Sequence, residues 1–199
     1  MKQLQKYFKV LVITLTMLTA EEISAQNIGG GVIGGFNFTQ ITGDGEAGFR
    51  KIGLNTGLMG IIPIKNKWNI HLEMLYTQKG SRLVFSPVFQ VLKYNYIEVP
   101  VYANFIDRGK YNFGAGITYA QLMEGKTASW MPTIEDWEVG ILLNFYTKLS
   151  GKLNINFRYQ TSFLRIADYV NQNGQNRGVV HSSITARLIF LLRDPLQVK

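Results

Sequence analysis

The residues in this sequence that could do chemistry are single charges set among uncharged neighbours. Their alternate spacing predicts one group that faces an enclosed interior, namely Glu73, Glu98, Glu138, Lys148, Arg158 and Arg187, with Lys79 and His71 beside them. Two carboxylates such as Glu73 and Glu98 could act as a general acid and a general base. Buried charges are costly unless they pair, so we expect instead a structural ion-pair network that fills the interior. A narrow polar pore, or a proton-sensitive gate, is the alternative use of the same side chains.

A second arrangement with chemical potential is the run His181-Ser182-Ser183, which puts a base and a hydroxyl on one face of an extended segment. Such a pair would suit a lipid-modifying hydrolase, but the base must be oriented by a third, acidic group. The neighbouring sequence offers no acidic residue, and the alternation turns both side chains inward. Two distant histidines and the absence of cysteine also leave no metal-ligand spacing. We predict no enzyme, no cofactor and no metal.

The segment Lys93–Phe105 shows what kind of element carries these charges. Its odd positions from Ile97 to Phe105 are all apolar, whereas the positions between them are polar, aromatic or proline, with Glu98 in the middle. Alternation with a period of two predicts a strand with two unlike faces. A tilted strand needs roughly 9–11 residues to cross a bilayer, and this segment is long enough. Pro100 lacks an N–H group, which predicts a bulge or a bend in the wall.

Seven other segments share this alternation. The eight predicted strands are Ile28–Thr39, Lys51–Ile62, Trp68–Lys79, Lys93–Phe105, Tyr111–Met123, Trp137–Leu149, Leu153–Leu164 and Val179–Leu191. Short turns alternate strictly with four long connections, which are Gln40–Arg50, Gly80–Leu92, Glu124–Asp136 and Arg165–Gly178. An even strand number with this alternation is typical of outer-membrane barrels, whose short turns are periplasmic. The sequence predicts an all-β fold, an eight-stranded antiparallel up-and-down transmembrane β-barrel with both termini in the periplasm.

A soluble β-sandwich or a lipocalin-like barrel is the alternative fold, because its strands would alternate as well. Its polar faces would form the surface, yet here these faces carry Gly, Asn, Tyr and isolated charges instead of a dense Lys and Glu coat. Aromatic residues near strand ends match the interfacial girdles of membrane proteins, and they include Trp68, Tyr76, Tyr111 and Trp137. The membrane barrel is therefore the favoured prediction.

The beginning of the chain predicts a cleaved secretory signal. Three lysines precede the apolar stretch Val10–Ala20, and Ala25 supplies a small residue at the cleavage position. The predicted organisation is a signal peptide over 1–25, an outer-membrane barrel over 26–192 and a short periplasmic tail over 193–199. The formal net charge is +8, but the Lys and Arg residues are scattered. We expect outer-membrane lipid and lipopolysaccharide as partners, and no nucleic acid.

Four motifs carry a resemblance to a known family. They are Gly29–Asn37, Leu72–Gly80, Tyr96–Val101 and Phe113–Gly116. Together they resemble the PorT-like outer-membrane β-barrel family of Bacteroidota, over about Gly29 to Phe190. The resemblance implies an outer-membrane barrel, and the family's named member is linked to type IX secretion and gliding. Such barrels often finish on an aromatic residue, whereas here Leu191–Lys199 follows Phe190.

The predicted external loops are polar, and Trp130 and Met131 form the one apolar group in them. Loops on a rigid scaffold commonly carry binding residues, so these two are the predicted loop contacts. The leading hypothesis is a non-enzymatic structural or accessory component of an envelope or secretion assembly, which would bind other envelope or secretion proteins. A narrow small-solute pore is the second hypothesis, and a lipid-modifying hydrolase is the third.

Overall fold

The computed structural model describes residues 28–42, 48–65, 67–83, 90–107, 111–126, 134–170 and 176–195. The strands in these ranges are β1 (Gly29–Thr42), β2 (Lys51–Lys65), β3 (Trp68–Leu83), β4 (Gln90–Asp107), β5 (Tyr111–Lys126), β6 (Trp137–Ser150), β7 (Leu153–Ser162), β8 (Ala167–Val170) and β9 (Asn176–Arg193). A search of the described residues finds no helix with the length and hydropathy of a membrane span. The predicted signal peptide, residues 1–25, lies outside the described residues.

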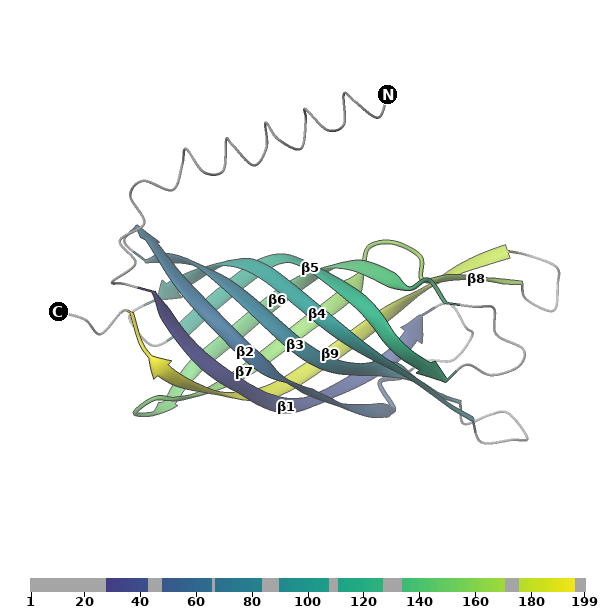
Figure 1. The fold of residues 1–199 in the computed structure, drawn as a ribbon, viewed down its shortest axis with the longest axis horizontal. Coiled ribbons are helices and arrows are strands. Elements are labelled where there is room, and N and C mark those ends of the chain that lie inside the picture. The colour runs from purple at the N-terminus through teal and green to yellow at the C-terminus, as the bar shows by residue number, and fades with distance from the viewer. Residues whose placement is uncertain are drawn as a thin grey trace, which may run out of the picture.

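Eight of the strands form one closed antiparallel barrel. Each strand pairs with its neighbour in the order β1-β2-β3-β4-β5-β6-β7-β9, and β1 pairs with β9 to close the ring. The connections from β2 to β3, β4 to β5 and β6 to β7 lie at the end where β1 begins and β9 finishes (Figure 1). We call this the turn end, and the opposite end the loop end. The predicted eight-stranded, antiparallel up-and-down barrel is confirmed.

The outer wall of the barrel is apolar and the inner wall is polar. Each barrel strand exposes large hydrophobic side chains, for example Phe36, Leu58, Leu72, Val101, Ile117, Leu143, Phe157 and Leu188. Each strand also buries a polar side chain, for example Asn37, Asn55, Glu73, Glu98, Thr118, Asn144, Arg158 and Arg187. A soluble sandwich or lipocalin-like barrel would have the reverse arrangement, with apolar residues inside. The structure therefore excludes that alternative.

The interior is filled in layers. A cluster of buried apolar side chains lies at the loop end, and it includes Ile41, Leu92, Tyr94, Tyr96, Ile166 and Val179. A second apolar cluster lies toward the turn end on β1, β2, β3 and β9, and it consists of Ile33, Met59, Ile61, Leu75, Ile189 and Leu191. Charged and amide side chains occupy the middle. This filling matches the expectation that an eight-stranded barrel is just wide enough for its own side chains.

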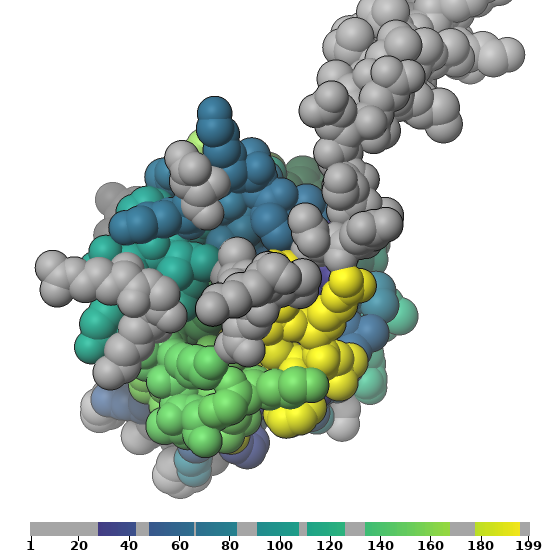
Figure 2. Space-filling model, turned by 90° about the vertical axis from the view of Figure 1, so that its left-hand side faces the viewer, coloured from purple at the N-terminus to yellow at the C-terminus, as the bar shows by residue number. Residues whose placement is uncertain are grey.

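The strands reach farther toward the loop end than the sequence indicated. β3 continues to Leu83 and β4 begins at Gln90, so much of the predicted connection Gly80–Leu92 is strand. The predicted connection Arg165–Gly178 contains β8, which pairs with the first residues of β9. Loop-end segments thus continue the sheet beyond the ring of eight strands (Figure 1). The view from the turn end shows the strand ends around the rim in blue, teal and green, and the end of β9 in yellow (Figure 2).

Pro100 interrupts the ladder between β3 and β4 without shifting it, so of the bulge or bend predicted there, the bulge is wrong. β3 and β4 pair as Leu72 with Val101 and as Leu75 with Glu98, and the register is the same on both sides of the gap. The pairings opposite Pro100 are missing because proline has no N–H group to donate. The register between β4 and β5 shifts instead opposite Asn95 and Tyr96, where Met123 is the extra, unpaired residue of a bulge in β5.

Glycines on the wall make room for large inward side chains. A Cβ atom on Gly35 would lie 2.6 Å from the Cα atom of Arg187 on the paired strand. A Cβ atom on Gly116 would lie 2.4 Å from the Cβ atom of Tyr102. Both approaches are too close for any residue but glycine. Arg187 and Tyr102 belong to the polar interior described below, so these glycines help to position it.

Replacement of Gly35 by alanine should destabilise the barrel by about 1–3 kcal/mol, since the added methyl group overpacks the β1–β9 seam. Gly34→Ala is a matched control, because a Cβ atom at Gly34 meets nothing within 4 Å. The free energy of unfolding, measured by urea titration in lipid vesicles, should change by less than about 0.5 kcal/mol for the control. Equal effects of the two substitutions would contradict the close packing at Gly35.

Candidate functional site

The charged interior is delivered by five strands through the two-residue period. Glu73 and Lys79 lie on β3, Glu98 on β4, Glu138 on β6, Arg158 on β7, and His181 and Arg187 on β9. All of these side chains are buried, and none is more than 2% exposed. Because each strand turns every second residue inward, charges far apart in the sequence meet across the lumen.

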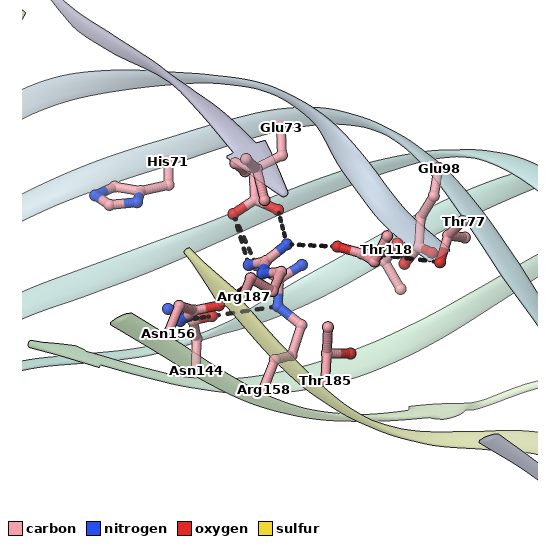
Figure 3. Close-up of polar contacts among 12 residues, drawn as sticks. His71, Glu73, Thr77, Glu98, Thr118, Asn144, Asn156, Arg158, Thr185 and Arg187 are labelled. Atoms are coloured by element: carbon pink, nitrogen blue, oxygen red, sulfur yellow. Dashed lines mark hydrogen bonds and ion pairs between the residues drawn. The ribbon is translucent and has the colours of Figure 1, made fainter. Parts of the chain in front are cut away.

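The first group of charges is centred on Glu73, and we call it the Glu73 cluster (Glu73, Tyr102, Arg158 and Arg187). Arg158 Nη2 lies 2.8 Å from Glu73 Oε1, and Arg187 Nη1 lies 3.0 Å from Glu73 Oε2 (Figure 3). The Tyr102 hydroxyl donates to Glu73 Oε1 at 2.7 Å. Because that bond uses its one hydrogen, the Tyr102 oxygen must accept from His71 Nδ1, which lies 3.0 Å away. The carboxylate is held from three sides.

Asparagines hold the two guanidinium groups from behind. Arg187 Nε donates to Asn156 Oδ1 at 2.7 Å, and Arg187 Nη1 also donates to Asn55 Oδ1 at 3.2 Å. Arg158 Nε donates to Asn144 Oδ1 at 3.2 Å. These amides and Tyr102 are functional residues that the charge pattern of the sequence does not single out. The sequence feature that could have identified them is their position, because each lies at an inward-facing place in the alternation of its strand.

The second group lies nearer the loop end, and we call it the Lys79 cluster (Lys79, Glu98, Glu138 and His181). Lys79 Nζ forms an ion pair with Glu138 and lies 3.3 Å from Glu98 Oε2. His181 Nδ1 lies 2.7 Å from Glu138 Oε2 and must be the donor, since a carboxylate only accepts. Glu98 Oε1 also accepts bonds, and its donors are Thr118 Oγ1 at 2.7 Å and Gln160 Nε2 at 2.6 Å.

The geometry does not fit acid–base catalysis by Glu73 and Glu98. The two carboxylates belong to different clusters, and each is bound by its own cations and hydrogen-bond donors. Across the two clusters three carboxylates face Lys79, Arg158 and Arg187, so the paired charges balance. This arrangement is what burial of charge requires.

The hydrolase arrangement is only half present. Glu138 supplies the acidic partner of His181 that the neighbouring sequence lacks, because it comes from β6, which only β7 separates from β9. The other ring nitrogen, His181 Nε2, is buried and has no hydrogen-bond partner among the described residues. Ser183 is also buried, at 4% exposure, but no hydrogen bond joins it to His181, because Nδ1 is bonded to Glu138 and Nε2 has no partner among the described residues. A nucleophile activated by His181 is not assembled.

The remaining predicted site residues fall outside both clusters. Lys148 has the inward parity but lies near the end of β6 at the turn end, where it is exposed. The structure does not bring it into the interior, because β6 has left the filled lumen at that point. Trp130 and Met131 lie outside the described residues. Within the described ranges, no three His, Cys, Asp or Glu residues lie close enough to hold a metal ion.

Comparison with solved structures identifies the architecture. Ail, the attachment invasion locus protein of Yersinia pestis, superposes with a TM-score of 0.50 and 12% identity, over 82% of this chain and 98% of that chain. The chain has the fold of an eight-stranded outer-membrane barrel. Neisserial surface protein A gives a TM-score of 0.45 at 10% identity, over 82% and 96% of the two chains. OprG from Pseudomonas aeruginosa gives 0.39 at 12% identity, over 82% and 91%.

The sequence comparisons add no family. No protein-family model matches this chain. No curated protein matches it in sequence. The fold therefore rests on the architecture and on the likeness to Ail.

Replacement of Glu73 by glutamine should destabilise the barrel strongly, by roughly 3–5 kcal/mol, because it leaves two buried arginines without their counter-charge. Glu124→Gln is the control, since Glu124 is exposed and accepts one bond from Asn95. The control should change the free energy of unfolding by less than about 0.5 kcal/mol. If both variants unfold at the same urea concentration as the native protein, the Glu73 cluster does not stabilise the fold.

Proposed function

We propose that this chain is an integral outer-membrane protein that acts as a non-enzymatic structural or accessory component of an envelope or secretion assembly. The observation that carries the proposal is the inverted barrel, in which an apolar wall surrounds a filled and charge-balanced interior. Bilayer hydrocarbon favours an outer wall of this kind, since every wall residue there faces lipid. Its loops, turns and outer wall would remain for binding other envelope or secretion proteins.

The membrane placement draws support from the aromatic residues of the outer wall. At the turn end Trp68 and Tyr111 are half exposed, and at the loop end Tyr119 and Trp137 are as well. Aromatic rings with a polar edge are favoured at the two membrane–water interfaces. We place the turns and both termini in the periplasm, which is the usual orientation of such barrels.

The resemblance to the PorT-like family supports the accessory role within this proposal. That family implies an outer-membrane barrel, and its named member is linked to type IX secretion and gliding. The filled interior fits the same role, because a plugged barrel has only its surface to offer to partners. Ail and the other similar barrels share the fold at low identity, so no activity of theirs is transferred.

Affinity isolation from native outer membranes, followed by mass spectrometry, tests the proposal. The detergent-solubilised, tagged protein should recover a larger envelope protein in stoichiometric amount. An unrelated tagged eight-stranded barrel from the same membranes is the control. Recovery of the chain alone, or of the same proteins as the control barrel, would count against an accessory role. Recovery in the soluble periplasmic fraction would overturn the membrane placement itself.

Planar-bilayer recording separates this proposal from the narrow pore. Because the two charged clusters and the loop-end apolar cluster fill the lumen, the reconstituted native protein should give no steady conductance. A general porin reconstituted under the same conditions provides the positive control. Reproducible unitary steps from the native protein would favour the small-solute pore and contradict the plugged interior.

A further inference from the structure

The described part of the outer wall carries a large groove, which the interior network does not explain. It crosses the wall over β4, β5, β6 and β7, has a volume of about 1060 Å³ and is lined almost wholly by apolar atoms. Pockets for small molecules commonly have volumes of roughly 300–1,000 Å³, so the groove is large enough for an elongated apolar ligand.

The groove forms because a pair of small residues on neighbouring strands lies next to a row of paired aromatic residues. Ala103 on β4 pairs with Ala115 on β5, and these two methyl groups form the floor. The neighbouring register row is aromatic across five strands, and it runs Trp68, Phe105, Phe113, Phe145 and Phe157. The ring centroids of Trp68 and Phe105 are 5.2 Å apart, as are those of Phe113 and Phe145. The packed aromatic rings form one side of the groove, and the two alanines form its floor.

One edge of the groove is basic and lies at the turn end. Lys67 directly precedes Trp68, and its Nζ atom lies 5.7 Å from the centroid of the Phe105 ring. Trp68 and Tyr111 mark the membrane–water interface at this end. The groove thus begins at headgroup depth beside the Lys67 cation and continues into the hydrocarbon region.

We infer that this groove binds an anionic glycerophospholipid of the leaflet at the turn end, with an acyl chain along Ala103 and Ala115 and its phosphate at Lys67. The inference rests on the proposed membrane placement. The apolar floor offers no hydrogen bond to a headgroup, whereas the lysine at the rim does. The groove is therefore apolar where the acyl chain would lie and basic where the phosphate would lie. A basic residue near the membrane surface favours an anionic lipid several-fold.

The groove suits a lipid chain better than a protein segment. β4, β5, β6 and β7 are each paired on both sides, so the wall offers no free edge for an added strand. An acyl chain needs only dispersion contacts, which the ring wall and the alanine floor supply.

The test measures which lipid lies against Trp68. The sequence contains three tryptophans, so Trp130→Phe and Trp137→Phe leave Trp68 as the only indole reporter. This protein is reconstituted in phosphatidylethanolamine vesicles that contain a phosphatidylglycerol with brominated acyl chains, and quenching of tryptophan fluorescence is recorded against lipid composition. We expect a preference of about fivefold for the anionic lipid at Trp68. Trp137, kept alone by Trp68→Phe and Trp130→Phe, lies outside the groove and should show no preference.

Two substitutions locate the site. Lys67→Glu should abolish the preference at Trp68 while leaving the quenching itself intact. Ala115→Leu should reduce it by filling the floor, whereas Val32→Leu on the far side of the barrel should not. Quenching without preference, equal at Trp68 and Trp137, would overturn the lipid site but leave the membrane placement standing. No quenching of either tryptophan would overturn the membrane placement as well.

Discussion

The closure of β1 on β9 is the constraint on which the rest of this structure depends. A strand in hydrocarbon must satisfy every backbone N–H and C=O group, and only a closed sheet leaves no unpaired edge. The seam runs from Gly30 paired with Arg193 to Thr42 paired with Val180. At this seam Gly35 has no Cβ atom, which allows the backbone of Arg187 on β9 to pack closely against it. Closure therefore fixes both the apolar outer wall and the narrow lumen.

The narrow lumen in turn dictates how the charges are used. Eight strands leave room for side chains and little else, so each buried carboxylate must find its cations inside. Glu73 takes two arginines, and Glu98 and Glu138 share Lys79. Charges that are engaged in this way stabilise the fold and are poor candidates for catalysis. Under the proposed function, the surfaces left for binding partners are the loops, the turns and the groove in the wall.

The two-residue period allowed the strands, their order and the inward set of Glu73, Glu98, Glu138, Arg158 and Arg187 to be predicted, because parity alone decides which wall a side chain joins. Parity does not decide where a strand leaves the filled lumen, so the sequence predicts Lys148 in the interior, whereas it lies exposed at the rim. Glu138 meets His181 through the register of β6, β7 and β9, which no local motif encodes. The groove depends on small residues that happen to pair, Ala103 with Ala115, and this too needs the register.

The most direct test of the inverted barrel uses the absence of cysteine from the sequence. Single cysteines at Leu72, Ile117 and Leu188, labelled with a nitroxide in reconstituted vesicles, report collisions with oxygen and with a water-soluble nickel chelate. The outward wall positions should be accessible to oxygen and shielded from nickel, whereas a label at Ser150 in the turn region should be accessible to nickel. Ready access of the nickel chelate to all three wall positions would show that the apolar wall does not face lipid.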